Sequence, residues 1–598
     1  MARLNVAPTI VVLGTGALPV AERIRARYAS ATIHALAGRA EGDVTFSELG
    51  AHLRALYARG NPVVALCAAG IVIRCVAPCL ADKGVEPPVL AVAEDGSAVV
   101  PLLGGLTGVN LLAREIAETL DTAPAITTSG ELRFGACVLN PPEGYALADI
   151  GAGKRFVSDL LAGATTRVDG PPVPWLEGVA LPVEVAGSHE IRITPKRAGG
   201  GSDELLIHPR SVVVALAEGF AHQAALEVAP AQTADDEAGS DPLARRILDA
   251  LAAADLSPLA LAALIAPRQD MREVALARAA RQLGVPLRFV ASEAGQAGKA
   301  ATLLDTTLAA GSIAASAAMP IGDDDETSKF LAIAIAEAPV DTNRLGQARG
   351  SLTVLGLGPG RADLLVPAAR LALAEATHIL GYATYVGMAG PFRADQRVHE
   401  TDNREELQRA RHAFELAAQG HRVAIVSSGD PGVFAIAAAV LEALDGTRAP
   451  AWDDVALEVV PGVSAAFATA AEAGAPLGHD FCVISLSDNL KPWRVIEERL
   501  ALAARADLVI AFYNPVSKAR PWQLDRALKI LREIRAADTV VVLGRDVGRP
   551  GASLRSLTLG ELSAANVDMR TMVIVGSSKT RRFASAEREW IYTPRFYD

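Results

Sequence analysis

The chain has 598 residues, of which 51% are hydrophobic and 21% are charged, and its formal net charge is −11. At about 100 to 200 residues per domain, this length predicts about three to five domains and excludes a single hydrophobic core. Gly, Pro or charged residues interrupt every apolar run before it reaches the about 18 residues that a membrane-spanning helix needs, so no membrane segment is expected. The acidic balance argues against nucleic acid as a partner. A signal-peptide pattern is missing and the five cysteines are few for this length, so we expect a cytoplasmic protein.

The first half of the chain alternates short β-branched runs with helical patterns rich in Ala, Leu and Arg, a rhythm typical of βα units. TIVVLGTG at 9–16 and NLLAREIAETL at 110–120 are examples. Cys67, Cys75 and Cys79 fit no CxxC spacing and have no nearby His, so we expect apolar filling there and no metal site.

Two polar segments predict domain boundaries. The acidic APAQTADDEAGSD at 229–241 has no periodicity, and PVDTNRLGQARG at 339–350 lies directly before a new strand. We therefore expect a multidomain α/β chain. Its expected parts are an N-terminal and central α/β region at 1–230, an acidic linker at 231–242, a further α/β domain at 243–338, a linker at 339–350 and a compact α/β enzyme at 351–598.

Three Gly- and Pro-rich turns in the last part each follow an apolar strand. They are GLGPG at 356–360, SSGDPGVF at 427–434 and PGVSAA at 461–466. Glycine in such turns lets the backbone approach a ligand closely. The first turn departs from the dinucleotide fingerprint, because Pro359 lies inside it and no GxGxxG follows, and the chain has no phosphate-binding P-loop. Phosphate binding is therefore not predicted.

In this order the turns resemble the tetrapyrrole methylase family, whose members use S-adenosylmethionine in a cleft between two α/β subdomains. Within the family, the match narrows to enzymes of cobalamin biosynthesis that methylate carbon 17 of precorrin-3B and contract its ring. The further segments that carry this resemblance are GYATYV at 381–386, APLGHDFCVISLSD at 475–488, LKPW at 490–493, FYNPVSKAR at 512–520, GRDVGRPG at 544–551 and VDMRTMVIVGSS at 567–578.

The resemblance implies a methylase fold of two α/β subdomains and S-adenosylmethionine as cofactor. The residues that it places in the cofactor site are Pro359, Gly429, Asp430, Val433, Ser464, Ala465, Leu486, Tyr513 and Asn514. Asp430 has a structural alternative, since a carboxylate before the helical pattern that follows it also suits a helix N-cap.

Methyl transfer from a sulfonium to a carbon atom of the macrocycle needs alignment and no nucleophilic side chain. Ring contraction also needs proton transfer at a hydroxyl or lactone oxygen. The candidates for this transfer are Asp488, His479, Tyr382 and Tyr385, and a structural role is the alternative for His479.

The substrate implied by the resemblance is a tetrapyrrole with acetate and propionate groups, which suits arginines that bind carboxylates. The basic residues expected to bind it are Arg545, Arg549, Arg555, Lys518 and Arg520. Solvated surface charges are the alternative for each one. The family also implies a homodimer, formed through the methylase half.

Residues 8–338 resemble the cobalt-precorrin-5A hydrolase family, which opens a lactone. PLLGGLTGVNLLAREIA at 101–117 and PAITTSG at 124–130 are among the matching segments. Where the family has a His-bearing turn, this chain has Leu106 and Thr107, and neither is a base near neutral pH. We favour a non-hydrolytic, corrinoid-binding role. The alternatives are a bifunctional methyltransferase and lactone hydrolase of the cobalt-containing route, and a module that passes intermediates through transient contacts with neighbouring enzymes.

Overall fold

The structure is a computed structural model. It describes residues 7–28, 31–80, 86–197, 201, 203–220, 241–291, 299–321, 330–390, 392, 395–402, 405–447, 449–517, 521–585 and 588–596. The chain forms two compact units, and the second unit begins at Gly350. Within the ranges given above, no helix has both the length and the apolar character needed to cross a membrane.

The first sheet of the N-terminal unit has the strand order β3-β2-β1-β4-β5-β6, and all its neighbours are parallel except β5 and β6. Its strands are β1 (Thr9–Val12), β2 (Thr32–Leu36), β3 (Val44–Phe46), β4 (Val63–Leu66), β5 (Val89–Val92) and β6 (Val99–Leu103). Helices α1 (Leu18–Arg27) and α4 (Val109–Leu120) cover one face, and α2 (Leu49–Ala58) and α3 (Ala69–Val76) cover the other. This explains why the central strands are apolar along their whole length.

The second sheet of this unit has the order β7-β10-β9-β8. Its strands are β7 (Tyr145–Leu147), β8 (Thr166–Asp169), β9 (His189–Ile193) and β10 (Glu204–Pro209), and the helices that accompany it are α5 (Ser129–Phe134), α6 (Ile150–Ala162) and α7 (Pro174–Glu177). Phe156 of α6 is fully buried in the core that this sheet shares with its helices.

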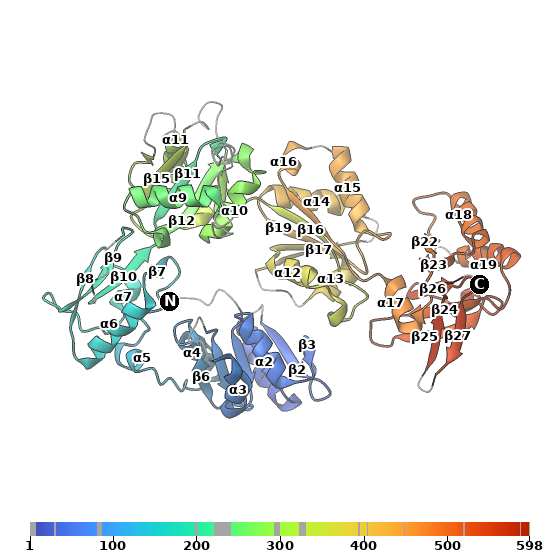
Figure 1. The fold of residues 1–598 in the computed structure, drawn as a ribbon, viewed down its shortest axis with the longest axis horizontal. Coiled ribbons are helices and arrows are strands. Elements are labelled where there is room, and N and C mark those ends of the chain that lie inside the picture. Colours follow the sequence, from blue (N-terminus) through green and yellow to red (C-terminus); the bar gives the residue numbers. More distant parts are fainter. Residues whose placement is uncertain are drawn as a thin grey trace. The chain divides into compact units, whose positions relative to one another are not determined.

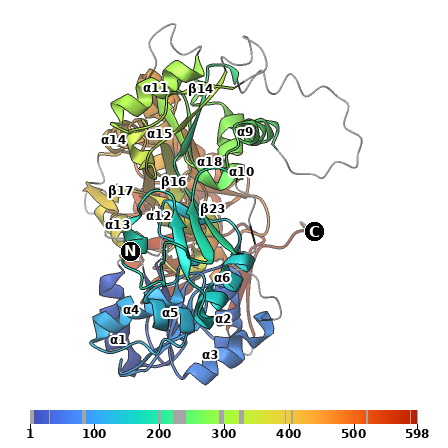
Figure 2. The same ribbon diagram turned by 90° about the vertical axis from the view of Figure 1, so that its left-hand side faces the viewer.

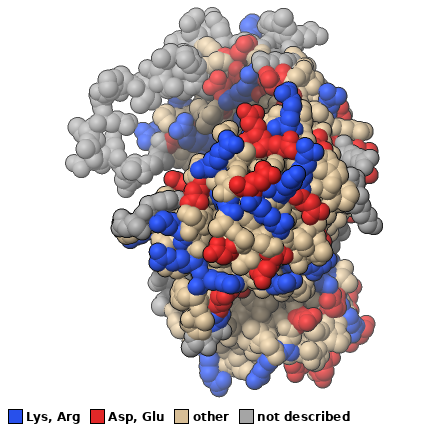
Figure 3. All heavy atoms as spheres, turned by 90° about the vertical axis from the view of Figure 1, so that its right-hand side faces the viewer, with Lys and Arg blue, Asp and Glu red and all other residues tan. Residues whose placement is uncertain are grey.

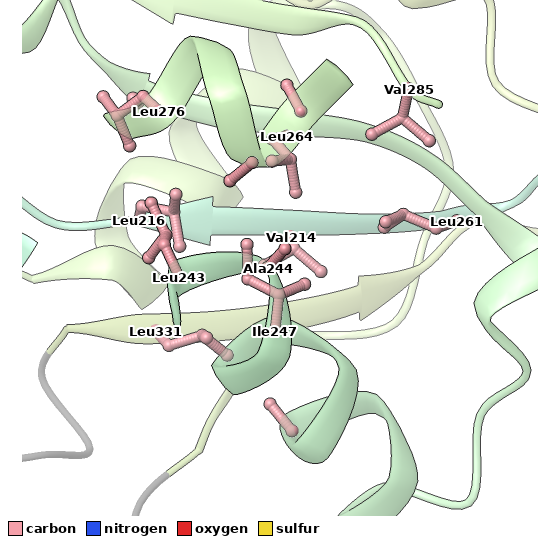
Figure 4. Packing of buried hydrophobic residues seen from close by; sticks show 14 of the residues in the cluster. Val214, Leu216, Leu243, Ala244, Ile247, Leu261, Leu264, Leu276, Val285 and Leu331 are labelled. Carbon is pink, nitrogen blue, oxygen red and sulfur yellow. The ribbon is translucent and has the colours of Figure 1, made fainter. Parts of the chain in front are cut away.

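The third sheet has the order β13-β12-β11-β15-β14. Its elements are β11 (Val212–Leu216), β12 (Leu261–Pro267), β13 (Leu287–Val290), β14 (Met319–Pro320), β15 (Leu331–Ile335), α9 (Pro242–Ala253), α10 (Val274–Leu283) and α11 (Ala300–Ala310). Helices α9 and α10 lie side by side on one face (Figure 2). Ile247 of α9 and Leu276 of α10 point toward the strand residues Val214 and Leu264 (Figure 4). Helix α11 covers the opposite face.

The strand β11 corrects the start predicted for the third domain. The sequence predicted a domain at 243–338 after an acidic linker at 231–242, but β11 pairs with both β12 and β15 and therefore belongs to this domain. Residues 221–240 lie outside the described residues, and they include 231–240, most of the predicted linker. Asp241 already belongs to the helix, because its carboxylate caps the first N–H groups of α9.

The segment 339–350, which the sequence predicted as a linker, packs against the third sheet. Leu345 is fully buried in the core beside α11, and Gln347 exchanges backbone hydrogen bonds with Phe289. This segment therefore closes the N-terminal unit, and the division of the chain follows it.

The first sheet of the C-terminal unit is entirely parallel, with the order β18-β17-β19-β16-β20. Its strands are β16 (Ser351–Gly356), β17 (His378–Tyr382), β18 (Arg397–Thr401), β19 (Arg422–Ser427) and β20 (Ala456–Val460). Figure 1 shows helices on both faces, namely α14 (Glu406–Ala418), α15 (Ile436–Thr447) and α16 (Pro450–Asp453) on one face and α12 (Pro367–Glu375) and α13 (Ala383–Ala389) on the other. This double cover explains why the central strands β17, β19 and β16 are mostly buried.

The second sheet of this unit has the order β22-β23-β26-β24-β25. Its strands are β22 (Phe481–Ser485), β23 (Val509–Tyr513), β24 (Val540–Arg545), β25 (Ser553–Thr558) and β26 (Thr571–Val575). Helices α18 (Trp493–Arg505) and α19 (Gln523–Ile534) cover one face, and α17 (Ala465–Ala473) covers the other. A small third sheet contains β21 (Gly474–Ala475), β27 (Arg581–Ala584) and β28 (Glu589–Tyr592).

Helix α17 joins the two large sheets of the C-terminal unit, because it follows β20 of the first and packs on the second. A Cβ atom added to Gly544 of β24 would lie 2.5 Å from the Thr469 side chain of α17, so the helix lies directly on the strand. The turn between β20 and α17 is consequently fixed against both sheets. The multidomain α/β class expected from the sequence is confirmed by these sheets.

Candidate functional site

The three Gly- and Pro-rich turns meet at one edge of the first sheet of the C-terminal unit. They follow β19, β16 and β20, which are adjacent and parallel, so their carboxyl ends lie at the same edge. The chain leaves β16 for β17 on one side and later returns to β20 on the other side. Such a reversal of strand order is where open α/β sheets bind ligands.

The backbones of these turns touch directly. The N–H of Gly358 donates to the carbonyl oxygen of Gly429 at 3.1 Å, and the N–H of Gly429 donates to the Gly358 oxygen at 2.8 Å. A Cβ atom at Gly356 or Gly462 would lie 2.3 Å or 2.1 Å from the same Gly429 oxygen. No side chain fits at these two positions, so the three turns are held in direct backbone contact.

Asp430 holds two of the turns together. Its carboxylate accepts hydrogen bonds from the N–H of Gly432 at 2.8 Å and from the N–H of Gly462 at 3.0 Å. The helix that follows begins only at Ile436. Asp430 is therefore not the N-cap of this helix, which was one of the two alternatives. It ties the PGVS turn to the SGDPG turn.

Further predicted cofactor residues lie where β22 and β23 end. The hydroxyl of Tyr513 donates to Ser464 Oγ at 2.9 Å and accepts from the N–H of Ala466 at 3.3 Å, which links β23 to the PGVS turn. Asn514 donates from Nδ2 to Ser485 Oγ at 3.1 Å. Leu486 is fully buried, and its N–H donates to the carbonyl oxygen of Tyr513 at 3.0 Å, which fixes the end of β22 against β23.

The other predicted cofactor residues belong to the same turns. Pro359 contacts the loop after β24, because a Cβ atom at Gly548 would lie 2.8 Å from its ring. Val433 follows Asp430 in its turn, and Ala465 is the first residue of α17. The structure thus brings the predicted cofactor residues to the carboxyl ends of two sheets.

The expected substrate-binding arginines make contacts within the protein. Arg549 donates from Nε to the carbonyl oxygen of Pro359 at 2.9 Å and from Nη2 to Ser428 Oγ at 3.1 Å. Arg545 forms ion pairs with Asp568 at 2.9 Å and with Asp546 at 3.0 Å. These partners satisfy much of each guanidinium group, so both arginines stabilise the loop after β24.

The structure gives little support for substrate binding by the other three basic residues expected from the sequence. Arg555 is exposed on β25, two residues inside the strand. Lys518 and Arg520 lie outside the described residues. On the face that is to the right in Figure 1, Lys and Arg side chains lie interspersed with Asp and Glu (Figure 3). The Arg526–Glu497 ion pair between α19 and α18 is an example of this balance.

Among the four candidates for proton transfer, His479 is misplaced for the role. It lies before β22, whereas Asp488 follows β22, and the five residues of this strand extend about 16 Å. His479 is therefore at the amino end of the sheet, away from the turns, where its Nδ1 accepts from the N–H of Asp480 at 2.7 Å. The structural alternative agrees with this placement.

Tyr382 ends β17, Tyr385 lies in the first turn of α13 directly after it, and Asp488 lies in the loop after β22. The two tyrosine rings make an edge contact at 5.4 Å where β17 runs into α13. Burial raises the pKa of Tyr385, and nearby Arg549 opposes this rise only in part. Asp488 accepts a hydrogen bond from Gln523 Nε2 at 3.3 Å.

Three residues of this region were not singled out from the sequence. Phe434 ends the SSGDPGVF motif and has a φ angle of 53°, which is strained for a bulky residue. Lys491 lies 5.5 Å above its ring. Gln523, at the start of α19, is 1% exposed, and its Oε1 has no hydrogen-bond partner among the residues described. Of these three, only Phe434 could have been noticed in the sequence, as an aromatic residue directly after a Gly- and Pro-rich turn.

Four histidines cluster in the first sheet of the C-terminal unit. The ring of His378 lies 4.4 Å from that of His421 and 5.3 Å from that of His399, and His412 Nε2 lies 3.4 Å from His399 Nδ1. His378 begins β17 and His421 precedes β19, so these two lie at the amino edge, opposite the turns. Across the described ranges, no three His, Cys, Asp or Glu side chains are arranged to hold a metal ion.

In the N-terminal unit, the turn that replaces the His-bearing turn is packed into the structure. The Thr107 hydroxyl donates to the carbonyl oxygen of Glu86 at 2.6 Å. Leu106 packs against the core of the second sheet. Both residues therefore have structural partners.

Comparison with known proteins agrees with this geometry. Residues 351–563 match the family of tetrapyrrole (corrin/porphyrin) methylases, and residues 51–131 match the family described as cobalamin synthesis G N-terminal. The chain is similar to a precorrin-3B C(17)-methyltransferase of Sinorhizobium sp., with 52% identity over 250 residues that cover 42% of this chain and 97% of the relative.

Two further relatives extend the comparison. A cobalamin biosynthesis protein CobIJ of Mycobacterium tuberculosis is 45% identical over 284 residues, which are 47% of this chain and 54% of that protein. The chain thus spans about half the length of this relative. A probable cobalt-factor III C(17)-methyltransferase of Salmonella typhimurium is 42% identical over 229 residues, which are 38% of this chain and 93% of the relative. The chain belongs, through its C-terminal unit, to the tetrapyrrole (corrin/porphyrin) methylases.

Proposed function

We propose that this chain transfers a methyl group from S-adenosylmethionine to carbon 17 of precorrin-3B and contracts the ring to give precorrin-4 in cobalamin biosynthesis. The C-terminal unit is an S-adenosylmethionine-dependent methyltransferase. The observation that carries the proposal is the contact of three glycine turns at one sheet edge, where a Cβ atom at Gly462 would lie 2.1 Å from the Gly429 oxygen.

The residues present fit S-adenosylmethionine, which supplies a methyl group on a sulfonium cation when bound. Its base and amino-acid tail need backbone donors and acceptors at short range, and glycine turns present them. The Asp430 carboxylate already accepts two backbone N–H groups, at 2.8 and 3.0 Å, so its negative charge is held within the turns. In this proposal the cofactor is held in one orientation by the glycine turns together with Asp430, Ser464 and Tyr513.

Proton transfer during ring contraction falls to Tyr385, Tyr382 or Asp488 in this proposal. Burial raises the pKa of Tyr385, so its hydroxyl stays protonated and can donate a hydrogen bond to the reacting oxygen, although the same shift makes it a weaker acid. Asp488 is held by Gln523 and suits an acceptor. His479 is not proposed, because β22 separates it from the turns.

The direct test is turnover by the purified chain. Anaerobic incubation with precorrin-3B and S-adenosylmethionine should yield a product with the mass and spectrum of precorrin-4. A parallel incubation with cobalt-factor III separates the metal-free from the cobalt-containing route. A folded chain that binds S-adenosylmethionine but converts neither compound would contradict the proposal.

For the N-terminal unit, we propose corrinoid binding without lactone hydrolysis. Thr107 is engaged with the Glu86 carbonyl oxygen, and Leu106 is packed in a core, so neither supplies a base. The expected result is that cobalt-precorrin-5A releases no acetaldehyde when it is incubated with the chain. Release of acetaldehyde at a catalytic rate would favour the bifunctional alternative.

We also propose a homodimer formed through the C-terminal unit. Phe467 of α17 and Phe481 of β22 make an edge contact at 6.0 Å, and both remain exposed, at 51% and 37%. Val483, two residues along the same face of the strand, is also exposed. An apolar patch beside an edge strand suits association of two copies. Light scattering should give a mass near twice that of one chain, and a monomer at micromolar concentration would contradict this.

A further inference from the structure

Phe434 lies between the two large sheets of the C-terminal unit, in a conformation that its own residue type disfavours. It follows the turn after β19, and its φ angle is 53°. Its ring lies 5.3 Å from that of Tyr513, which ends β23 of the second sheet, yet 48% of Phe434 is exposed. Strained non-glycine residues that keep an apolar side chain in solvent gather at ligand sites.

The loop between β22 and α18 places a cation beside this ring and carries an exposed apolar residue directly before that cation in the sequence. Lys491 Nζ lies 5.5 Å from the centre of the Phe434 ring. Its neighbour Leu490 is 95% exposed. Burial lowers the pKa of Lys491, and the positive charge of Arg499 adds to this effect. The two causes of this lowered pKa, burial and Arg499, both disfavour the charged form, and neither supplies a countercharge.

Lys491 differs from Arg545 and Arg549 in its lack of an internal partner among the described residues. Arg545 is paired with Asp568 and Asp546, and Arg549 is bonded to Pro359 and Ser428. For Lys491, no ion pair is recorded with any residue that the structure describes. A carboxylate from a ligand would therefore find Lys491 available without displacing an internal partner.

We propose that Phe434, Leu490 and Lys491 form a substrate-recognition surface that receives one edge of the carboxylate-bearing macrocycle. The Phe434 ring and Leu490 contact the conjugated, apolar part of the tetrapyrrole, and Lys491 binds one of its acetate or propionate groups. This inference rests on the proposed function. It assigns substrate binding to residues other than the arginines that the sequence favoured.

The test measures binding of precorrin-3B and of S-adenosylmethionine separately, in the full chain. Phe434→Leu and Lys491→Met should each weaken precorrin-3B binding, followed by absorbance without cofactor, by about tenfold. The affinity for S-adenosylmethionine, measured by calorimetry, should stay within twofold of wild type. Lys491→Arg should restore most of the precorrin-3B affinity, because it restores the charge.

Two matched controls are available in the same unit. Phe583 is 51% exposed and makes an edge contact with Tyr592 at 5.9 Å, so Phe583→Leu repeats the loss of an exposed ring beside a tyrosine. Lys529 is exposed on α19, so Lys529→Met repeats the loss of a charge. Both controls should bind precorrin-3B as wild type does.

The outcomes separate this inference from the proposed function. Unchanged precorrin-3B affinity in Phe434→Leu and Lys491→Met would overturn the inference, and so would an equal loss of cofactor affinity, which would place these residues at S-adenosylmethionine. If wild type binds precorrin-3B but does not methylate it, the proposed function fails while the recognition surface is still tested by binding. Failure of wild type to bind precorrin-3B would overturn both.

Discussion

Replacing Gly462 by alanine should disable the site through a single methyl group. The added Cβ would lie 2.1 Å from the carbonyl oxygen of Gly429, whereas ordinary contacts begin at 3.4 Å. The two turns must therefore separate by about 1.3 Å. Gly462 does not have a positive φ angle, so the effect is one of space and not of backbone conformation.

The size of the effect follows from what this separation breaks. The Gly429 oxygen accepts from the N–H of Gly358 at 3.1 Å, and its loss costs about 0.5 to 1.5 kcal/mol. Forcing an extra carbon into packed surroundings costs about 1 to 3 kcal/mol more. We expect a loss of about 2 to 4 kcal/mol in unfolding free energy. A misplacement of about 1 Å lowers methylation about 100-fold.

The assay compares Gly462→Ala with Gly446→Ala. A Cβ at Gly446, within α15, would meet nothing within 4 Å, so this control should fold and bind as wild type does. Cofactor affinity is measured by calorimetry, stability by thermal unfolding and turnover by methyl transfer. If Gly462→Ala bound S-adenosylmethionine as tightly as the control, contact between the turns would not be what forms the cofactor site.

Three further predictions test other parts of the C-terminal unit. Arg549→Lys removes the guanidinium group that joins Pro359 to the loop after β24. Calorimetry should therefore show that the affinity for S-adenosylmethionine falls about tenfold. If only tetrapyrrole binding were lost, Arg549 would instead be a substrate-binding residue. Gln523→Leu removes the hydrogen bond to the Asp488 carboxylate, so kcat should fall about tenfold and the pH profile of kcat should shift, while cofactor affinity stays constant. An unchanged pH profile would refute a positioning role for Gln523. Burial and neighbouring histidines lower the pKa of His378 to about 4, below the ordinary value of 6.5. The neutral form therefore stabilises the fold above pH 6.5, and this stability is lost as the pH falls toward 4. Thermal unfolding should show a smaller loss over this range in His378→Gln, and an equal loss would exclude His378 as the cause.

The turns and the strands before them could be predicted because their signals are local. GLGPG, SSGDPGVF and PGVSAA each combine an apolar strand with residues that permit tight turns. Their mutual contact depends on strand order, which places β16 between β19 and β20 although β17 and β18 come between them in the chain. The expectation that the three turns form one site therefore came from the resemblance to the methylase family, because the periodicity of the strands does not predict their order.

Nearness in the sequence was misleading where a strand intervenes. His479 and Asp488 belong to one motif, yet β22 lies between them and sends them to opposite ends of the sheet. The start of the third N-terminal domain was misplaced for a related reason. β11 precedes the acidic segment in the chain but pairs across it with β12.

The roles of charged residues were the least predictable part, because their partners are remote. Arg545 meets Asp568, and Arg549 meets Pro359, 190 residues away in the chain. The sequence shows only that basic residues lie near the Gly- and Pro-rich turns, whereas binding depends on which of these charges lack an internal partner.

In the proposed site, backbone groups bind the cofactor and side chains bind the substrate. In the proposed site, the cofactor side consists of the turn backbones that meet at Gly358 and Gly429, and Arg549 and Asp430 hold those turns in place. The substrate side must then rely on side chains that are still free to bind. Within the part of the C-terminal unit that the structure describes, Phe434 and Lys491 satisfy this condition at the place where the two sheets meet. In the proposed recognition surface, a chain with a net charge of −11 binds a polycarboxylate through the local cation Lys491 beside an exposed ring, so the total charge does not decide binding.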